Sequence, residues 1–405
     1  MANPIFGLTI TQVDNEPRPA VAADLSTIGL VVTAPDADVD AFPLNTPVLI
    51  NSADDVTVAL LGATGTIASQ IDLINAQLTG FSASARIVIV RVEAGVDEDA
   101  TMVNLIEGIA ALEDAESMLG VAPRLIGVPG FTHQQDTPAT ANPVVAALPA
   151  TLEKLVGHAV ITGPHSTLQA YTDWRETISS KRLIPVETWV KVGVAATDVD
   201  SVGAVLGLIV ARDNENGGRP FKSAANRPIQ GIVNVNRPIP FSTTDGNTEG
   251  QQILALNGGI IVRGEAGSVT SLGSGGFTFV GTDTAGEDDL WRFYNVTRGR
   301  DYIHLMFLRT LRFYLGRFNL TGQTIEAILN TMKIALRDLE ATQDILGFQV
   351  GFEASKNSPE NMRMGRFTVN FKAEEPPVLR HLSIESYRYR PALDALLENI
   401  LANAA

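Results

Sequence analysis

Short apolar runs alternate with longer amphipathic segments from about residue 24 to residue 212. The short runs are rich in Val and Ile, as in strands buried on both faces, whereas the longer segments repeat apolar residues at helical spacing. This alternation predicts crossover units, and therefore a mainly parallel sheet covered by helices on both faces. The predicted strands are 27–32, 85–92, 124–128, 159–162 and 186–190, and the predicted helices are 54–61, 66–78, 102–115, 143–156, 166–181 and 201–212.

The pattern changes after residue 212. Residues 213–286 are rich in Gly, Asn, Pro and Ser, with short strands expected at 259–263 and 277–280, which is typical of a loop-rich connector. The remaining sequence predicts long helices at 296–318 and 322–341, strands at 347–354, 366–372 and 382–389, and a terminal helix at 391–402. The expected class is α/β, or α+β overall, with a C-terminal helix-plus-strand domain.

Both ends of the chain carry a strand pattern next to a stiff polar or Pro-containing linker. Residues 5–13 alternate and precede a break at 14–19, and residues 382–389 follow Glu374-Glu375-Pro376-Pro377. Strands outside their own domain favour β-augmentation of neighbouring copies, although the C-terminal strand has a hairpin within one subunit as its alternative. The expected inter-subunit contacts are Phe6, Leu8, Ile10, Leu382, Ile384 and Tyr387, and the expected hinges are 15–20 and 373–378.

These boundaries divide the chain into five parts. They are an N-terminal extended arm (1–20), an acidic outer α/β portion (21–123), a central α/β domain with the loop-rich connector (124–285), a C-terminal domain with long helices (286–372), and a C-terminal arm strand with its terminal helix (373–405).

Composition narrows the class of function. The 405 residues include no Cys, which excludes disulfides, thiolate catalysis, iron–sulfur clusters and Cys-bearing zinc sites. The formal net charge is −15, and residues 1–123 hold 17 acidic against 3 basic residues, which argues against a nucleic-acid groove. The longest apolar stretch, 202–211, is too short to cross a membrane, and residues 1–4 carry no secretory signal pattern, so we expect folding in a cytoplasm and no direct membrane insertion.

Familiar catalytic and cofactor signatures are absent from the sequence. There is no phosphate loop, dinucleotide fingerprint, zincin helix or nucleophile elbow, and the Gly-rich run 272–276 predicts a turn. His158 and His165 flank a predicted strand at opposite ends, which favours structural histidines over a metal pair. Glu287, Asp288 and Asp289 could hold a cation, but adjacent loop carboxylates usually only solvate the loop. We therefore predict no catalytic residue, no cofactor and no metal site.

Residues 291–319 form a basic segment in an otherwise acidic protein, with six Arg against a single acid, Asp301. Arg309 and Arg312 share a helix face at i, i+3 spacing. The segment is either a face that is solvated or paired with the chain's own acids, or a docking face for an acidic partner. The docking hypothesis assigns Arg298, Arg309, Arg312 and Arg317 to the partner.

The order of segments resembles one known family. The blocks that carry this resemblance are RLIGVPG at 124–130, VLGLIVARD at 205–213 followed by GRPFKSAAN at 218–226, LALNGGII at 254–261 and WRFYNVTR at 291–298. Together they resemble the sheath proteins of contractile phage tails and R-type pyocins, over about residues 124–390.

The resemblance implies a structural subunit and not an enzyme. Such subunits polymerise as a helical cylinder around a tail tube and contract from a metastable extended state to drive the tube through a cell envelope. It also implies assembly in the host bacterial cytoplasm, a final place in the virion tail, and a homo-oligomer with baseplate and tail terminator proteins as partners. The basic residues would then face an acidic tail tube protein.

Two alternatives remain from the sequence. One is a non-contractile ring or baseplate component of the same fold. The other is an α/β enzyme acting at the C-terminal edge of the sheet, near Pro129 or Gly163.

Overall fold

A computed structural model describes residues 20–78, 84–264 and 275–404 of the chain. Its centre is a six-stranded sheet in the order β2-β3-β1-β4-β5-β6, in which all neighbours are parallel except the edge strand β2, which pairs antiparallel with β3. The strands are β1 (Ile28–Thr33), β2 (Pro47–Asn51), β3 (Arg86–Val92), β4 (Leu125–Gly127), β5 (His158–Thr162) and β6 (Leu183–Val186). The expected mainly parallel sheet is confirmed.

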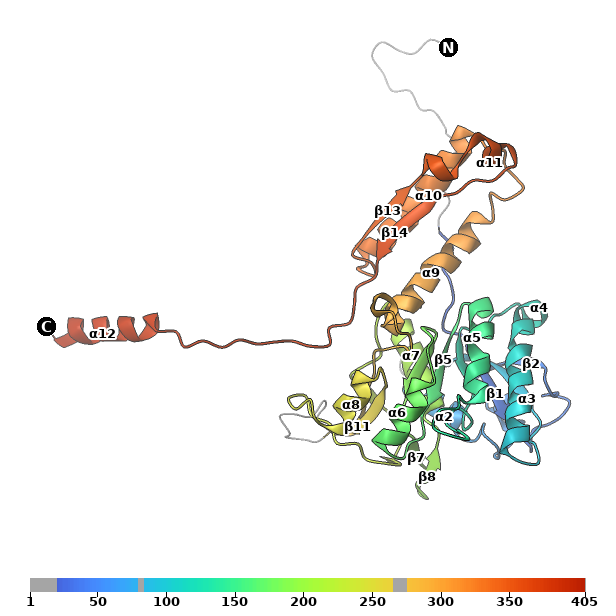
Figure 1. Ribbon diagram of the computed structural model, residues 1–405, viewed down its shortest axis with the longest axis horizontal. Helices are drawn as coiled ribbons and strands as arrows, with labels where there is room; N and C mark the ends of the chain where they lie inside the picture. The colour runs from blue at the N-terminus through green and yellow to red at the C-terminus, as the bar shows by residue number, and fades with distance from the viewer. Residues whose placement is uncertain (1–19, 79–83, 265–274, 405) are drawn as a thin grey trace, which may run out of the picture.

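Helices cover both faces of this sheet (Figure 1). On one face lie α2 (Gln70–Gln77) and α7 (Val202–Glu215). The other face carries α3 (Glu98–Ala111), α5 (Pro143–Leu155) and α6 (Leu168–Glu176). Helix α7 is buried nearly all round because it lies between the sheet and α2, and a Cβ at Gly207 would come within 2.7 Å of the Ile74 carbonyl oxygen. Only Gly allows this close approach of two helix backbones.

Short elements complete the body below α9 in Figure 1. The connector expected at 213–286 is loop-rich. Three of its strands form a small antiparallel sheet in the order β11-β12-β9, and its β10 joins two strands that precede the connector in a second sheet, in the order β10-β7-β8. These strands are β7 (Val190–Val192), β8 (Thr197–Val199), β9 (Arg227–Ile229), β10 (Asn234–Val235), β11 (Ile260–Arg263) and β12 (Phe277–Val280). The short helices are α1 (Asp55–Ala59), α4 (Ala115–Leu119), α8 (Glu249–Ala255) and the 3-10 helices η1 (Leu112–Asp114) and η2 (Asp289–Trp291).

The C-terminal elements project away from the sheet (Figure 1). The long helices α9 (Tyr294–Leu311) and α10 (Gly322–Ala341) pack with the antiparallel pair β13 (Gly347–Gly351) and β14 (Asn370–Glu374) around a third apolar core. Between the two strands lie η3 (Ala354–Lys356) and α11 (Pro359–Arg363), and the chain ends in α12 (Pro391–Ala404) on an extended segment.

One expectation about these elements is wrong. Helix α9 ends at Leu311 and not near residue 318, because Arg312 caps it and turns follow up to residue 318. Residues 382–389 pair with no strand among the described residues, and their expected pairing with a neighbouring copy stays a prediction. The five-part division of the chain remains a prediction. None of the described helices combines the length and apolar composition that a membrane-spanning helix needs.

Candidate functional site

The start of the C-terminal segment is fastened to α9. Arg300 donates from Nε and Nη2 to the two carboxylate oxygens of Glu375, at 2.7 and 2.8 Å, and Nη2 also reaches the Ala373 carbonyl. Glu375 is only 4% exposed, so this bidentate pair is largely shielded from water. The stretch 373–378, expected to be a hinge, is therefore held against the body.

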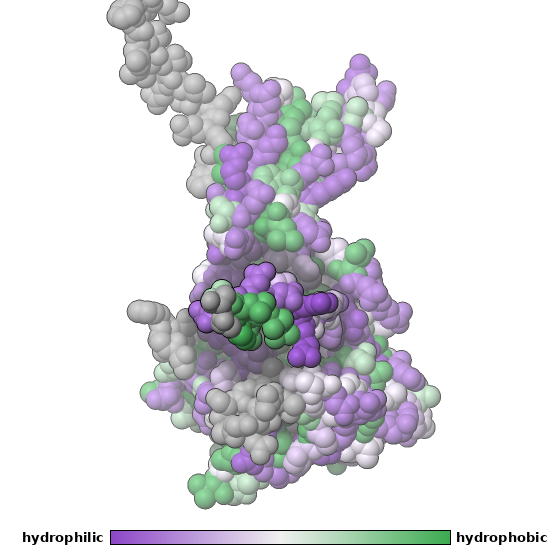
Figure 2. Space-filling model, turned by 90° about the vertical axis from the view of Figure 1, so that its left-hand side faces the viewer, coloured by the Kyte–Doolittle hydropathy of each residue, from purple (hydrophilic) through white to green (hydrophobic). Residues whose placement is uncertain are grey.

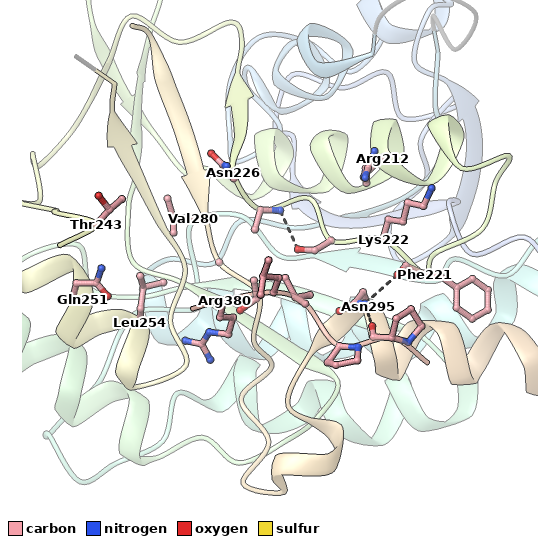
Figure 3. A pocket seen from close by; sticks show the side chains of 18 of the residues that line it. Arg212, Phe221, Lys222, Asn226, Thr243, Gln251, Leu254, Val280, Asn295 and Arg380 are labelled. Atoms are coloured by element: carbon pink, nitrogen blue, oxygen red, sulfur yellow. Dashed lines mark hydrogen bonds between the residues drawn. The ribbon is translucent and has the colours of Figure 1, made fainter. Parts of the chain in front are cut away.

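The next residues remain attached along a surface pocket of about 580 Å³ (Figure 3). Asn295 donates to the Pro376 carbonyl at 3.3 Å and to the Phe221 carbonyl at 3.1 Å. Arg380 donates to Asp283 at 2.8 Å, and its guanidinium lies 6.0 Å from the ring of Phe293. The chain becomes free of the body only after Arg380.

Beyond Arg380 the chain exposes apolar side chains that a folded monomer would ordinarily bury. Leu382, Ile384 and Tyr387, expected as inter-subunit contacts, are 69%, 82% and 84% exposed. The segment has an extended backbone with no strand partner in the described chain. The matching N-terminal residues Phe6, Leu8 and Ile10 lie outside the described residues.

The β13–β14 pair leaves both of its outer edges open among the described residues. It is a two-stranded antiparallel sheet, and neither outer edge pairs with another strand in the described part of the chain. Its strands pack on the third core through Phe348, Val350 and Phe371. An isolated pair is marginal, and each open edge offers unpaired backbone donors and acceptors to a further strand.

The basic segment divides into buried and exposed halves. Arg298 is 1% exposed and donates to both carboxylate oxygens of Asp213, at 3.1 and 2.5 Å, so the expectation that Arg298 faces a partner is wrong. The Arg298 side chain is enclosed between α7, which supplies Asp213, and the Leu25 carbonyl, which accepts from Arg298 at 3.2 Å. Burial raises the pKa of Asp213 although Arg298 opposes the shift.

Two further arginines of the segment also serve the chain's own fold: Arg292 pairs with Asp283 and Arg300 with Glu375. Arg309 is half-buried and donates to the Ala22 carbonyl, whereas Arg312 and Arg317 are exposed. Arg309, Arg312 and Arg317 therefore remain the candidate partner-facing residues.

A groove of about 960 Å³ lies where α9 ends, between the α9–α10 turn, α10 and the segment leading into β14. Its apolar lining includes Leu308, Leu315 and Phe318, which are 63%, 76% and 49% exposed. Arg312 lines the same groove. The apolar side chains of this region thus leave part of their surface uncovered.

The C-terminal edge of the main sheet carries structural polar groups. Asp200 accepts from the Gly130 amide at 2.7 Å, the Thr162 hydroxyl at 2.9 Å and the Val202 amide at 3.1 Å. Burial raises the pKa of Asp200 to about 6. Its carboxylate oxygens accept hydrogen bonds that join the ends of β4 and β5 to α7. Asp200 therefore has a structural role and is not paired with a nucleophile.

The histidines and the acidic run have structural partners. His158 shares a hydrogen bond with Thr297 at 3.1 Å, and His165 stacks on Trp189 with centroids 4.3 Å apart, so the two do not meet. Asp288 caps η2, and Asp289 lies 3.8 Å from Arg292. Among the residues that the structure describes, no cluster of three or more His, Asp or Glu could hold a metal ion.

The sequence analysis missed the anchor of the C-terminal segment and the groove. Glu375 and Arg380 flank Pro376-Pro377, and an opposite-charge pair around a linker was the available signal for an anchored segment. The groove had no signal, because it forms between parts of the chain that are far apart in sequence.

Sequence comparisons find relatives among phage tail sheath proteins. No family model matches the chain. The chain is 24% identical over 398 residues to the tail sheath protein of Escherichia phage P2, covering 93% of this chain and 94% of the relative. It is 27% identical over 386 residues to a putative prophage major tail sheath protein of Pseudomonas aeruginosa strain UCBPP-PA14, covering 92% and 93%.

The fold also matches that of a single chain in a solved assembly. The structure superposes on a chain of the anti-feeding prophage (AFP) helical sheath in its contracted state with a TM-score of 0.70 and 15% identity, covering 96% of this chain and all of that one. The chain is thus similar in sequence over nearly its full length to phage tail sheath proteins, and it shares the fold of a chain of that contracted sheath.

Proposed function

We propose that the chain is the structural subunit of a contractile tail sheath and not an enzyme. It polymerises with copies of itself as a helical cylinder around a tail tube, as part of a virion tail. The sheath contracts from a metastable extended state and drives the tube through a cell envelope. Baseplate and tail terminator proteins are the proposed partners at the two ends of the cylinder.

The observation that carries this proposal is the combination of an exposed C-terminal segment and an open-edged strand pair in one chain. A segment that exposes Leu382, Ile384 and Tyr387 gains by pairing with the β13–β14 edge of a neighbour, since backbone hydrogen bonds and apolar burial then act together. The segment that is added and the edge that receives it are different surfaces, so the contact is heterologous. Such contacts repeat from copy to copy and build an open helical assembly. Phe6, Leu8 and Ile10 are proposed to link copies in the same way.

Contraction requires that copies stay linked while they move. The segment is fastened up to Arg380 and free beyond it, so a body can rotate without pulling its paired strand out of a neighbour. The stored energy comes from folding and assembly, with more contact buried in the contracted lattice.

The tube contact is proposed to be electrostatic. Arg309, Arg312 and Arg317 would face an acidic tail tube protein in the extended state. A screened contact between exposed charges is weak enough to be broken as the sheath widens.

Negative-stain electron microscopy tests the sheath proposal. The purified chain is compared, with and without a candidate tube protein, with variants that lack residues 1–14 or residues 382–405. Striated cylinders that disappear in both deletions, while circular dichroism stays that of the parent, are expected. The matched control is Val96→Asp with Val194→Asp, because both side chains are fully exposed on other surfaces. Discrete rings in all variants would instead indicate a ring or baseplate component, and discrete monomers would end the proposal.

A further inference from the structure

Helix α12 exposes an entire apolar face. Its apolar residues recur at i, i+3, i+4, i+7 and i+8, the spacing with which an amphipathic helix enters a groove. These residues are 53–69% exposed, and they are Leu393, Leu396, Leu397, Ile400 and Leu401. In Figure 2 the end of this helix faces the viewer, with apolar and hydrophilic side chains gathered on different sides. The face therefore has no partner within the described chain.

The groove at the end of α9 has the complementary chemistry. Its volume is about 960 Å³, and the side chains that it leaves exposed are large and apolar, among them Leu308, Leu315 and Phe318. Arg312 also lines it and has no ion-pair partner among the described residues. Helix α12 carries Asp394 and Glu398 and no basic residue. Glu153 and Asp301 also line the groove, but both pair with Arg182. Arg312 is therefore the groove charge left to meet Asp394 or Glu398 of the helix.

The positions of helix and groove also agree. Phe371 of β14 and Phe367 just before it line the groove, so the groove adjoins the strand pair that is proposed to receive residues 382–389. Helix α12 begins at Pro391, directly after that segment. A neighbour's strand added to this sheet would therefore bring that neighbour's helix to the groove.

We propose that this groove is the docking site for α12 of a second copy of the chain. The inference rests on the proposed function, because it requires copies that meet through their C-terminal segments. The strand then supplies backbone hydrogen bonds and the helix supplies apolar burial at an adjoining site. Two linked contacts hold a moving neighbour better than one, since release of either leaves the other at high effective concentration.

Disulfide trapping tests the docking site, because the chain contains no Cys of its own. One copy carries Leu315→Cys, and a co-expressed copy with a different tag carries one Cys on α12. The apolar-face variants are Leu393→Cys, Leu397→Cys and Leu401→Cys, and the matched controls on the opposite side are Ala395→Cys and Asn399→Cys. The helical period predicts at least about fivefold more covalent heterodimer from the apolar face than from the controls. These positions are exposed, so thermal unfolding should match that of the parent.

Three outcomes would overturn the docking site. Equal yields at all five positions would mean random collision, and a disulfide within one chain carrying both Leu315→Cys and Leu397→Cys would place the helix in its own groove. A heterodimer that increases only after removal of residues 1–14 would assign the groove to that segment.

Micrographs of the same samples separate this inference from the proposed function. Cylinders without the periodic pattern of yields would reject the docking site and leave the sheath in place. The periodic pattern in small oligomers without cylinders would reject the sheath and retain the docking site.

Discussion

Arg298 and Asp213 form an ion pair in which each side chain is only 1% exposed. Removing one partner leaves the other charge buried and unpaired, and such a change costs about 3–5 kcal/mol. Arg298→Ala should therefore lower the free energy of unfolding by that amount, measured by urea denaturation of the unassembled chain. Replacing both partners, as in Arg298→Met with Asp213→Leu, should recover much of the loss, since no charge remains buried.

The matched control for this prediction is Arg317→Ala in the same basic segment. Arg317 is exposed, so its loss should change the free energy of unfolding by less than about 0.5 kcal/mol. Equal destabilisation by Arg298→Ala and Arg317→Ala would contradict the structural role assigned to the buried pair.

Glu187 should make stability depend on pH. Burial raises the pKa of its carboxyl from 4.5 to about 7, so between these values the folded chain binds a proton that the unfolded chain has lost. The contribution of Glu187 to the free energy of unfolding is fully present below about pH 4.5 and is lost as the pH rises through 7. The total loss is about 3 kcal/mol. Glu187→Gln should therefore gain stability relative to the parent across this window, measured by urea denaturation at pH 4.5 to 8.

The comparison with the parent removes contributions that both chains share. His133 acts in the opposite direction, because burial lowers its pKa to about 4 and stability then rises with pH. A difference between Glu187→Gln and the parent that stays constant with pH would show that Glu187 keeps its ordinary pKa.

Helices that begin with a clear N-cap residue were predictable from the sequence. Helices α5 and α10 begin where expected, because Asn142 and Thr321 accept hydrogen bonds from the first-turn amides. The strand expected at 186–190 is instead β6, Leu183–Val186, which contains Pro185. An edge strand tolerates Pro, but the sequence does not reveal which strand lies at an edge. The strand β2 was missed for a similar reason, since only its pairing with β3 defines it.

The candidate site was predictable only in part. Apolar alternation at 382–389 identified the segment that lies exposed, because that pattern is local. The partners of the arginines are not local: Arg298 meets Asp213 from α7, 85 residues earlier. Charge counting along the sequence therefore overestimated how many arginines are free to meet a partner.

The fastening of the C-terminal segment to α9 gives a prediction for proteolysis. Glu375→Ala removes both hydrogen bonds from Arg300, and charge-assisted bonds of this kind contribute about 1.5–3 kcal/mol. Local opening should become at least about tenfold more frequent, so trypsin should cleave after Arg380 correspondingly faster. Mass spectrometry of timed digests measures this rate.

Cleavage after Arg388 provides the internal control, because that residue is already exposed on the free segment. Its rate should be the same in Glu375→Ala and in the parent. Equal acceleration at both positions would mean that the substitution unfolds the chain generally and does not release an anchor.

The distribution of charge over the subunit bears on how a sheath holds its tube. Residues 1–123 hold 17 acidic and 3 basic residues, whereas exposed arginines gather beyond the end of α9. An acidic tube should meet the basic region and be repelled by the acidic one. The extended assembly should therefore lose tube binding as salt increases, because exposed ion pairs are screened over about 8 Å at physiological ionic strength.

Arg309→Glu with Arg317→Glu tests this electrostatic contact and leaves out Arg312, which lines the groove. The variant should form cylinders but co-sediment with the tube at least about tenfold less at low salt, since each reversed charge turns attraction into repulsion. Arg86→Glu with Lys191→Glu reverses the same amount of charge on β3 and β7 of the body and should bind like the parent. The contrary result is that Arg309→Glu with Arg317→Glu binds the tube as well as the parent does at every salt concentration. That result would mean that apolar contacts hold the tube. Contraction would then have to break a contact that salt does not weaken.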